Sequence, residues 1–170
     1  MTNMGIGFTG FKATSGNNDN YITRISNIPS DVELITVSGS FNDLYQGYTL
    51  GTIDDADDST IAGCMNLFFT ALLTAFPTVP IGIYTTGPWG SYHSGVSSSD
   101  NYVDMLRRMG LKYGIPFYSI YDQTNLRPWN DANKTYYFGS DTTHPNSNGH
   151  KLMYAAYKPF IERLVYPKQT

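Results

Sequence analysis

The chain has 170 residues, of which 41% are hydrophobic and 15% charged, a balance typical of one globular domain rather than of a disordered chain. Its net charge of -3 and pI near 5.4 argue against a nucleic-acid partner, which would need a basic face. The longest apolar-rich run, residues 61–76, is too short and too interrupted to span a bilayer, so we expect no membrane partner either.

The start of the chain, "MTNMGIGFTG", lacks the basic region and apolar core of a signal peptide. We therefore expect a soluble protein, and its localisation stays open between several compartments, an extracellular or phage-particle setting included. Cys64 is the only cysteine, which excludes an intrachain disulfide and a Cys-based zinc site. It falls in an apolar helical stripe, so we expect a buried structural thiol.

Strand-like and helix-like patterns alternate along the chain. We expect helices at residues 18–27, 61–76, 99–113 and 147–164. We expect β-branched, mostly apolar strands at residues 32–39, 79–86 and 115–122. Gly110 and Pro159 weaken the last two helices locally. This order predicts an α/β fold, with a parallel sheet covered by helices on both faces.

Two long segments follow predicted strands, at residues 86–99 and 123–140. Both are rich in Gly, Ser, Asn and aromatic residues, and in this architecture such loops gather where ligands bind. Their aromatic side chains could stack on a sugar as a substrate-binding surface, or could simply cover the core. These aromatic residues are Trp89, Tyr92, Trp129, Tyr136 and Tyr137.

The stretch "DTTHPNSNGH", residues 141–150, carries the clearest chemical signal. Asp141 lies three residues before His144, outside regular structure, where a carboxylate can hold an imidazole as a general base. The alternative is that Asp141 caps a turn and His144 lies at a helix entrance, because short motifs of this kind are frequent. His93 and His150 fit surface or packing positions, and the three histidines show no metal-ligand spacing.

A second signal, "GSFNDL", follows the first predicted strand. The Asn42 amide could donate to an oxyanion, a contribution of about 3–4 kcal/mol at a well-placed site, or it could close an Asx-turn. Near the amino terminus, Gly5 and Gly7 follow a short apolar segment that we expect to be a strand. They could turn a backbone N–H toward the same crevice, or only form a tight turn.

Taken in this order, these motifs resemble the SGNH hydrolases, also called GDSL-type esterases. The run from Asp141 to Asn146 is similar to the family block D-x-x-H-P-N, Asn42-Asp43 to the core of G-x-N-D, and residues 3–7 to the N-x-G-x-x-G segment. The resemblance implies a flavodoxin-like α/β/α domain across the chain. It also implies His144 as base, Asp141 as its orienter, an oxyanion hole from Asn42 and the Gly7 N–H, and no cofactor or metal.

The sequence departs from the family in three places. Ser40 stands where the family has glycine two residues before Asn42, and the second-block glycine falls at Gly7 or Phe8 depending on the alignment. No G-D-S occurs in these 170 residues, so the resemblance predicts that the family's interior first strand and catalytic serine are absent. Ser15, Ser38 and Ser40 are candidates for a recruited nucleophile, although most such serines are turn residues.

The function we expect is a serine esterase of SGNH type acting on short acyl esters, including carbohydrate O-acetyl groups. The alternative is a non-catalytic carbohydrate- or partner-binding module of a phage tail or cell-wall protein on a hydrolase fold. A third hypothesis is an assembly subunit whose open sheet edge accepts a strand from a partner chain or from a second copy.

Overall fold

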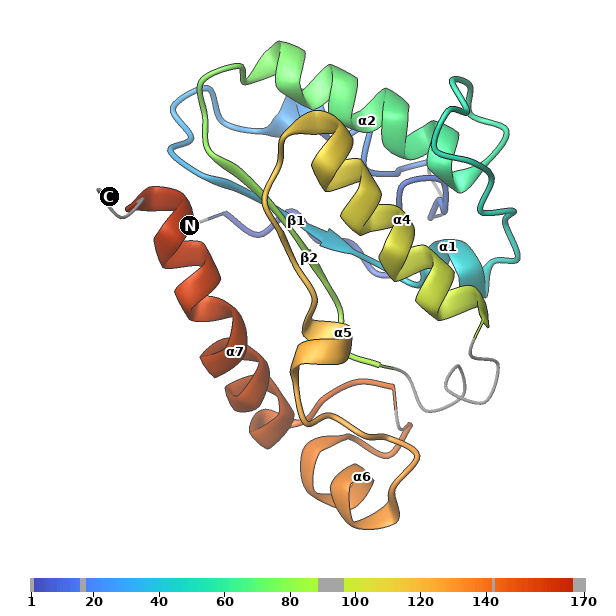
Figure 1. The fold of residues 1–170 in the computed structure, drawn as a ribbon, viewed down its shortest axis with the longest axis vertical. Helices are drawn as coiled ribbons and strands as arrows, with labels where there is room; N and C mark the ends of the chain where they lie inside the picture. Colours follow the sequence, from blue (N-terminus) through green and yellow to red (C-terminus); the bar gives the residue numbers. More distant parts are fainter. Residues whose placement is uncertain (1, 16–17, 89–96, 142, 167–170) are drawn as a thin grey trace.

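The computed structural model describes residues 2–15, 18–88, 97–141 and 143–166 (Figure 1). Its secondary-structure elements alternate between helices and strands. They are η1 (Ile25–Asn27), β1 (Ile35–Gly39), α1 (Asn42–Tyr45), α2 (Ile61–Ala75), β2 (Ile81–Thr85), α4 (Ser97–Tyr113), β3 (Phe117–Tyr118), α5 (Ile120–Gln123), α6 (Asp131–Tyr137) and α7 (Ser147–Val165).

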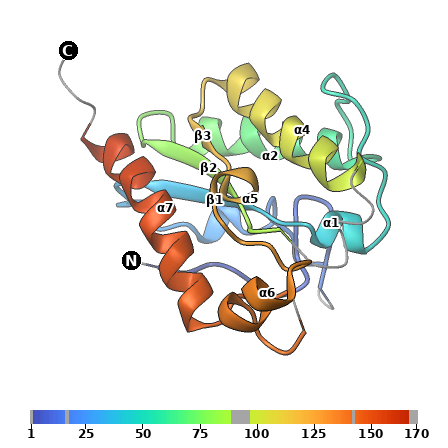
Figure 2. The same cartoon turned by 60° about the horizontal axis from the view of Figure 1, so that its bottom comes forward.

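The described strands form one parallel sheet in the order β1-β2-β3. Ile35 pairs with Ile81, and Ile83 pairs with Phe117. Helices α2 and α4 cover one face, and α7 covers the other (Figure 1 and Figure 2). The β-branched runs form strands here because both faces of a covered parallel sheet are buried. The predicted three-layer α/β class is confirmed.

The core lies between the sheet and the α2–α4 layer. The apolar residues of α2 recur at three- and four-residue steps, and most of this helix is buried. Thr60 begins the helix, with its hydroxyl accepting a hydrogen bond from the Gly63 N–H at 3.1 Å. Cys64 is buried in this stripe as predicted, and burial raises the pKa of its thiol.

On the opposite face, α7 packs closely against β2. A Cβ at Gly82 would lie 2.3 Å from Leu164 and 3.0 Å from the Phe160 ring, so glycine lets the helix approach the strand. The Tyr84 and Tyr157 rings stack with their centroids 5.5 Å apart. Helix α7 continues through Pro159, so this proline does not end it.

Two predicted elements are shorter in the structure than expected. The expected helix at residues 18–27 is reduced to η1, because the Asn20 side chain accepts the N–H groups of Ile22 and Thr23 and closes a turn. The expected strand at residues 115–122 is shortened to β3, since the Ser119 hydroxyl accepts the Asp122 N–H and starts α5.

The long segment at residues 123–140 contains a helix that the sequence pattern did not predict. The Asn130 side chain accepts the Asn133 N–H at 3.0 Å and begins α6. The segment is therefore ordered by an Asn cap rather than by an apolar stripe. No helix in the described part of the chain is long and apolar enough to cross a membrane.

The expected amino-terminal strand is absent. Residues 2–6 form no strand, and β1 is the edge strand of the described sheet. Ile6 is 45% exposed and Phe8 is 67% exposed, so the apolar side chains of this segment face solvent. An isolated extended segment without a neighbouring strand has no ladder to join, which explains why the apolar pattern did not form a strand.

Candidate functional site

The Asp141–His144 pair is in direct contact. The His144 Nδ1 atom lies 2.5 Å from Asp141 Oδ2. Asp141 Oδ1 accepts the backbone N–H groups of His144 at 2.9 Å and Thr143 at 3.0 Å. The carboxylate therefore caps the turn with one oxygen and contacts the imidazole with the other.

The surrounding backbone fixes this turn. Phe138 and Pro145 form an isolated antiparallel bridge, and the Gly139 N–H donates to the His144 carbonyl at 2.8 Å. The Asn146 side chain accepts the N–H groups of Asn148 and Gly149 at the start of α7. The D-x-x-H-P-N run is thus a closed turn whose last residue is the helix N-cap.

Hydrogen bonds to the charged form hold the pKa of Asp141 well below its ordinary value. The backbone N–H of His144 contributes most, followed by the His144 side chain and the Thr143 N–H. Asp141 is therefore ionised at neutral pH and can hold the Nδ1 proton of the imidazole. The His144 side chain is 81% exposed, which leaves its far edge, with Nε2, toward solvent.

Asn42 begins α1 directly after β1. Its amide donates to the Thr9 carbonyl at 2.9 Å, and its backbone N–H donates to the Ser40 hydroxyl at 3.2 Å. Ser40 thus takes a turn-closing role at the position where the family has glycine. One amide proton of Asn42 is committed to Thr9, and an amide carries a second.

The residue after Asn42 is the most heavily bonded side chain in this region. Asp43 is fully buried and accepts the N–H groups of Phe11, Lys12 and Ala13 at 3.1, 2.9 and 2.6 Å. The Tyr102 hydroxyl donates to the same carboxyl at 3.4 Å. Burial raises the pKa of Asp43, while these donors oppose that rise.

Asp43 therefore ties residues 11–13 to α1, a role that sequence reasoning missed. A Cβ at Gly10 would lie 2.5 Å from its carboxylate, so the glycine permits this close approach. The signal was present in the Asn-Asp pair after a buried strand, but only the Asn was assigned a role.

The two alignments of the second block differ in backbone conformation. Phe8 has φ of 63°, in the left-handed region that favours glycine, and the Gln46 side chain donates to its carbonyl at 2.7 Å. Gly7 does not have a positive φ, and a Cβ there would meet no atom within 4 Å. Phe8 therefore has the conformation expected of the block glycine.

The predicted substrate-binding residues fall in two groups. Trp89 and Tyr92 lie outside the described residues, as does His93. Trp129 precedes α6 and is 46% exposed, and Tyr136 is 59% exposed. The Tyr136 and Tyr137 rings pack edge to face, with their centroids 4.9 Å apart.

Helix α1 and the connection between α6 and α7 lie at the same end of the described sheet, where the strands end (Figure 1 and Figure 2). Asn42 and the Asp141–His144 pair therefore share the end at which parallel sheets bind ligands.

No described serine hydrogen-bonds the His144 ring. Ser38 bonds Tyr84, and the backbone of Ser15 is paired with Asp19. Two surface hollows of the described chain, about 350 and 310 Å³, are lined by other residues, among them Lys112 in the first and Arg163 in the second. Neither hollow includes Asn42 or the Asp141–His144 pair.

No family model matches the sequence, and no curated protein matches it. Among solved structures, one from Lactobacillus plantarum is similar at 28% identity and a TM-score of 0.81, over 94% of this chain and 79% of that one. A Bacteroides uniformis protein, provisionally named a GDSL-like lipase, is 19% identical at a TM-score of 0.63, over 91% and 63%. A Bacteroides ovatus protein with the same provisional name is 17% identical at a TM-score of 0.60, over 91% and 68%.

These likenesses support an α/β fold of the SGNH or GDSL-like type. At the identity of the two Bacteroides proteins, the likeness concerns the fold alone. The chain spans less than two thirds of the length of the Bacteroides uniformis protein.

Proposed function

We propose that this chain is part of an SGNH-type acyl hydrolase that acts on short acyl esters. The observation that supports this most strongly is the Asp141–His144 pair, with the carboxylate fixed by two backbone N–H groups and the imidazole 2.5 Å away. A carboxylate that fixes the imidazole tautomer on one side and leaves Nε2 open on the other is the arrangement a general base needs.

The proposed reaction proceeds through an acyl-serine. A serine Oγ attacks the ester carbonyl carbon while its proton passes to His144 Nε2. The alkoxide leaves with that proton, and water then hydrolyses the acyl-serine with His144 again as base. The second amide proton of Asn42 and the N–H of Gly7 or Phe8 would donate to the oxyanion. No metal or cofactor takes part in these steps.

We propose that the serine lies in a G-D-S segment outside these 170 residues. The sequence contains no G-D-S, and the hydroxyls of Ser38 and Ser40 already bond Tyr84 and the Asn42 N–H. The third serine considered, Ser15, pairs with Asp19 through its backbone. A nucleophile must lie within hydrogen-bonding reach of Nε2. The open far edge of the His144 ring leaves room for it.

Carbohydrate O-acetyl groups are the substrate class that the exposed aromatic side chains favour. Trp129 precedes α6 and Tyr136 lies in its last turn, and both side chains are about half exposed. Helix α6 packs against α7 beside the Asp141 turn. Exposed rings of this kind offer flat apolar surface with a polar edge, which suits a sugar.

The test is hydrolysis of p-nitrophenyl acetate by the purified chain, alone and with a synthetic peptide that carries an apolar strand followed by Gly-Asp-Ser. His144→Ala should lower the rate by roughly 100-fold or more, because it removes the general base. His150→Ala is the matched control, since His150 is exposed on α7, and it should leave the rate unchanged. Absence of His144-dependent turnover in both conditions would contradict the hydrolase.

The second candidate is a carbohydrate-binding module on a hydrolase fold. Two observations favour it: the absence of G-D-S, and the bond that commits an Asn42 amide proton to the Thr9 carbonyl. Binding of acetylated oligosaccharides, followed by calorimetry, should then be the same in His144→Ala as in the original chain. Trp129→Ala should weaken it if the exposed rings form the binding surface.

A further inference from the structure

The turn at residues 6–9 carries the backbone N–H groups that the proposed oxyanion hole needs. Neither the Gly7 nor the Phe8 N–H donates a hydrogen bond to another described residue. The Ile6 carbonyl accepts the Thr9 hydroxyl at 2.8 Å and the Thr9 N–H at 3.4 Å, which closes the turn. Phe8 is the third residue of this turn and has φ of 63°, a conformation that glycine usually provides. The direction of the free N–H groups therefore depends on a strained backbone that the surroundings must hold.

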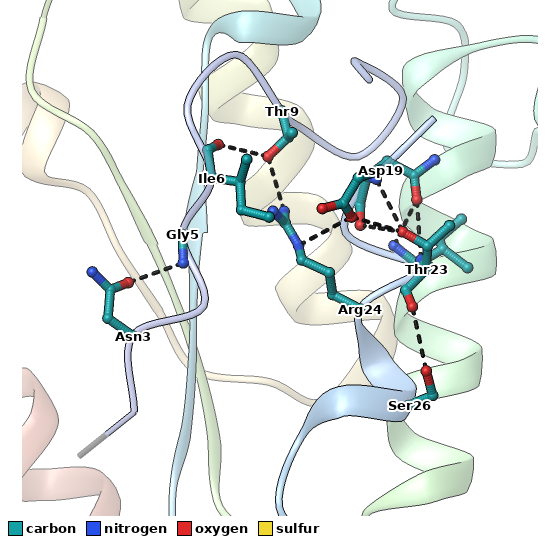
Figure 3. Close-up of polar contacts among 10 residues, drawn as sticks. Asn3, Gly5, Ile6, Thr9, Asp19, Thr23, Arg24 and Ser26 are labelled. Atoms are coloured by element: carbon teal, nitrogen blue, oxygen red, sulfur yellow. Dashed lines mark hydrogen bonds and ion pairs between the residues drawn. The ribbon is translucent and has the colours of Figure 1, made fainter. Parts of the chain in front are cut away.

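Thr9 connects this turn to two other groups. It is buried, and its hydroxyl accepts the Arg24 Nη2 at 2.9 Å while it donates to Ile6 (Figure 3). Its carbonyl accepts the Asn42 amide at 2.9 Å. A hydroxyl has one proton and a guanidinium only donates, so these bonds fix the direction of the Thr9 hydroxyl. Both kinds of oxyanion donor, the turn N–H groups and the Asn42 amide, are therefore joined at Thr9.

Arg24 is itself held from several sides. Figure 3 shows its guanidinium between Thr9 and Asp19, and the Nε atom lies 3.8 Å from an Asp19 carboxylate oxygen. The guanidinium carbon lies 5.1 Å from the centroid of the Tyr21 ring. The Tyr21 hydroxyl in turn donates to the Ser38 carbonyl at 2.8 Å, near the end of β1. The guanidinium therefore joins the turn to the strand that precedes Asn42.

The burial of this cation is not explained by stability. Arg24 is 9% exposed, and its Nη1 atom is buried without a hydrogen-bond partner in the described part of the chain. An unpaired buried donor loses its hydration without compensation, and such a group in a folded protein calls for an explanation in strain or function. A methionine of similar length would fill the space without this loss. The bond that the guanidinium makes to the Thr9 hydroxyl explains its presence better.

We propose that Arg24 is a positioning residue for the oxyanion hole. Through the Thr9 hydroxyl it fixes the turn that presents the Gly7 and Phe8 N–H groups. It thereby also holds the Thr9 carbonyl that orients the Asn42 amide. Preorganised donors stabilise a transition state because they need no reorientation when the charge develops. This inference deepens the proposed function and rests on it, since an oxyanion forms only if the chain is part of a hydrolase.

The test measures the order of both kinds of donor in the full, isotope-labelled chain by NMR relaxation. In the original chain the Phe8 N–H should have an order parameter near the rigid value of about 0.85, and the Asn42 amide should be similarly rigid. Arg24→Met keeps the apolar stem of the side chain, and Thr9→Val keeps the shape without the hydroxyl. Each should lower both order parameters below about 0.6. Thr9→Ser keeps the hydroxyl and should restore the order of the original chain.

Two controls separate positioning from a general loss of structure. The Phe11 N–H, which the Asp43 carboxylate accepts, should keep its order in every variant. Thr23→Val makes the same change at an exposed hydroxyl that bonds Asp19 beside Arg24, and it should leave both kinds of donor rigid. Circular dichroism establishes that each variant is folded.

The combined variant decides whether Arg24 acts through Thr9. If it does, Arg24→Met together with Thr9→Val should reduce the order no further than either change alone. Additive losses, or unchanged order of both kinds of donor in Arg24→Met, would overturn the proposal. A loss of order that extends to the Phe11 N–H would also overturn it, because Arg24 would then only support the fold.

Turnover with the Gly-Asp-Ser peptide separates this inference from the hydrolase. If the original chain shows His144-dependent turnover, Arg24→Met should lower kcat by about tenfold or more and leave KM nearly unchanged, because the oxyanion exists only after attack. An unchanged kcat would keep the hydrolase and refute the positioning role. Donors that loosen in Arg24→Met, without His144-dependent turnover in the original chain, would refute the hydrolase and keep Arg24 as the residue that orders these groups.

Discussion

The central strand β2 and the outer strand β1 of the described sheet are built differently. At β2, α7 packs against Gly82 on one face and the α2–α4 core covers the other, while β1 and β3 pair with its two edges. At β1, one face packs on the core through Gly39 and Leu106, but Thr36 is exposed and the outer edge is unpaired. Asn42 follows β1, so this part of the candidate site lies at the end of the strand whose outer edge is unpaired.

The largest expected effect is at Asp43, whose buried carboxylate ties residues 11–13 to α1. Asp43→Asn replaces a carboxyl oxygen by an NH₂ group, and either orientation sets it against N–H donors from residues 11–13. We expect the free energy of unfolding, measured by urea denaturation, to fall by about 3 kcal/mol. Asp104→Asn, at an exposed position of α4, should change the free energy of unfolding by less than about 0.5 kcal/mol.

An Asp43→Asn loss no greater than that of Asp104→Asn would show that residues 11–13 do not depend on the buried carboxylate. Asp43 would then not be the residue that holds residues 11–13 to α1, at the end of β1.

A pair of glycine substitutions compares the covered face of β1 with the open amino-terminal segment. A Cβ at Gly39 would lie 2.2 Å from Leu106, so Gly39→Ala should cost about 1–3 kcal/mol by overpacking. A Cβ at Gly7 meets nothing within 4 Å, so Gly7→Ala should be neutral or stabilising by up to about 1 kcal/mol. Thermal unfolding measures both, and a larger loss at Gly7 would mean that the open segment is packed in solution.

Phe8 offers a smaller and more local test. Its left-handed backbone costs an L-residue about 1–2 kcal/mol, which glycine avoids, while glycine loses some of this gain through backbone entropy. Phe8→Gly should therefore be more stable than Phe8→Ala by about 1 kcal/mol in urea denaturation. Alanine is the matched control because it removes the exposed ring and keeps the strained conformation. Equal stabilities would place Phe8 outside the left-handed region in solution.

The smallest effect concerns pH. The folded pKa of Asp141 lies below its unfolded value, so the stability from this group is present above about pH 4 and is lost as the pH falls through the folded pKa. Because the Asp141 carboxylate is exposed, its titration is followed by its carboxyl NMR signal and not by the free energy of unfolding. His144→Ala should keep most of the depression, since the backbone N–H of residue 144 is its largest cause. A return to the ordinary value would assign the shift to the imidazole.

Periodicity and residue type predict β1 and β2, a longer strand at the position of β3, and helices α2, α4 and α7. The apolar stripe of α2 and the buried thiol of Cys64 follow from local spacing, because a helix turns through a fixed angle per residue. The Asp141–His144 contact is predicted as well, since three residues in a turn bring two side chains together.

Other features depend on side chains that compete locally with the backbone. Asn20 replaced an expected helix by turns, Ser119 ended an expected strand, and Asn130 started an unexpected helix. Each is a hydrogen bond over two or three residues that apolar periodicity does not detect, although the residue types favour caps and turns.

The sequence by itself determined the α/β class and the acid–histidine pair, since both depend on neighbours within a few residues. Only the tertiary structure decided the open edge of β1, the burial of Asp43 and the unpaired Nη1 of Arg24. These arise where residues more than ten positions apart meet, and whether a polar group is paired there depends on what the rest of the fold brings to it.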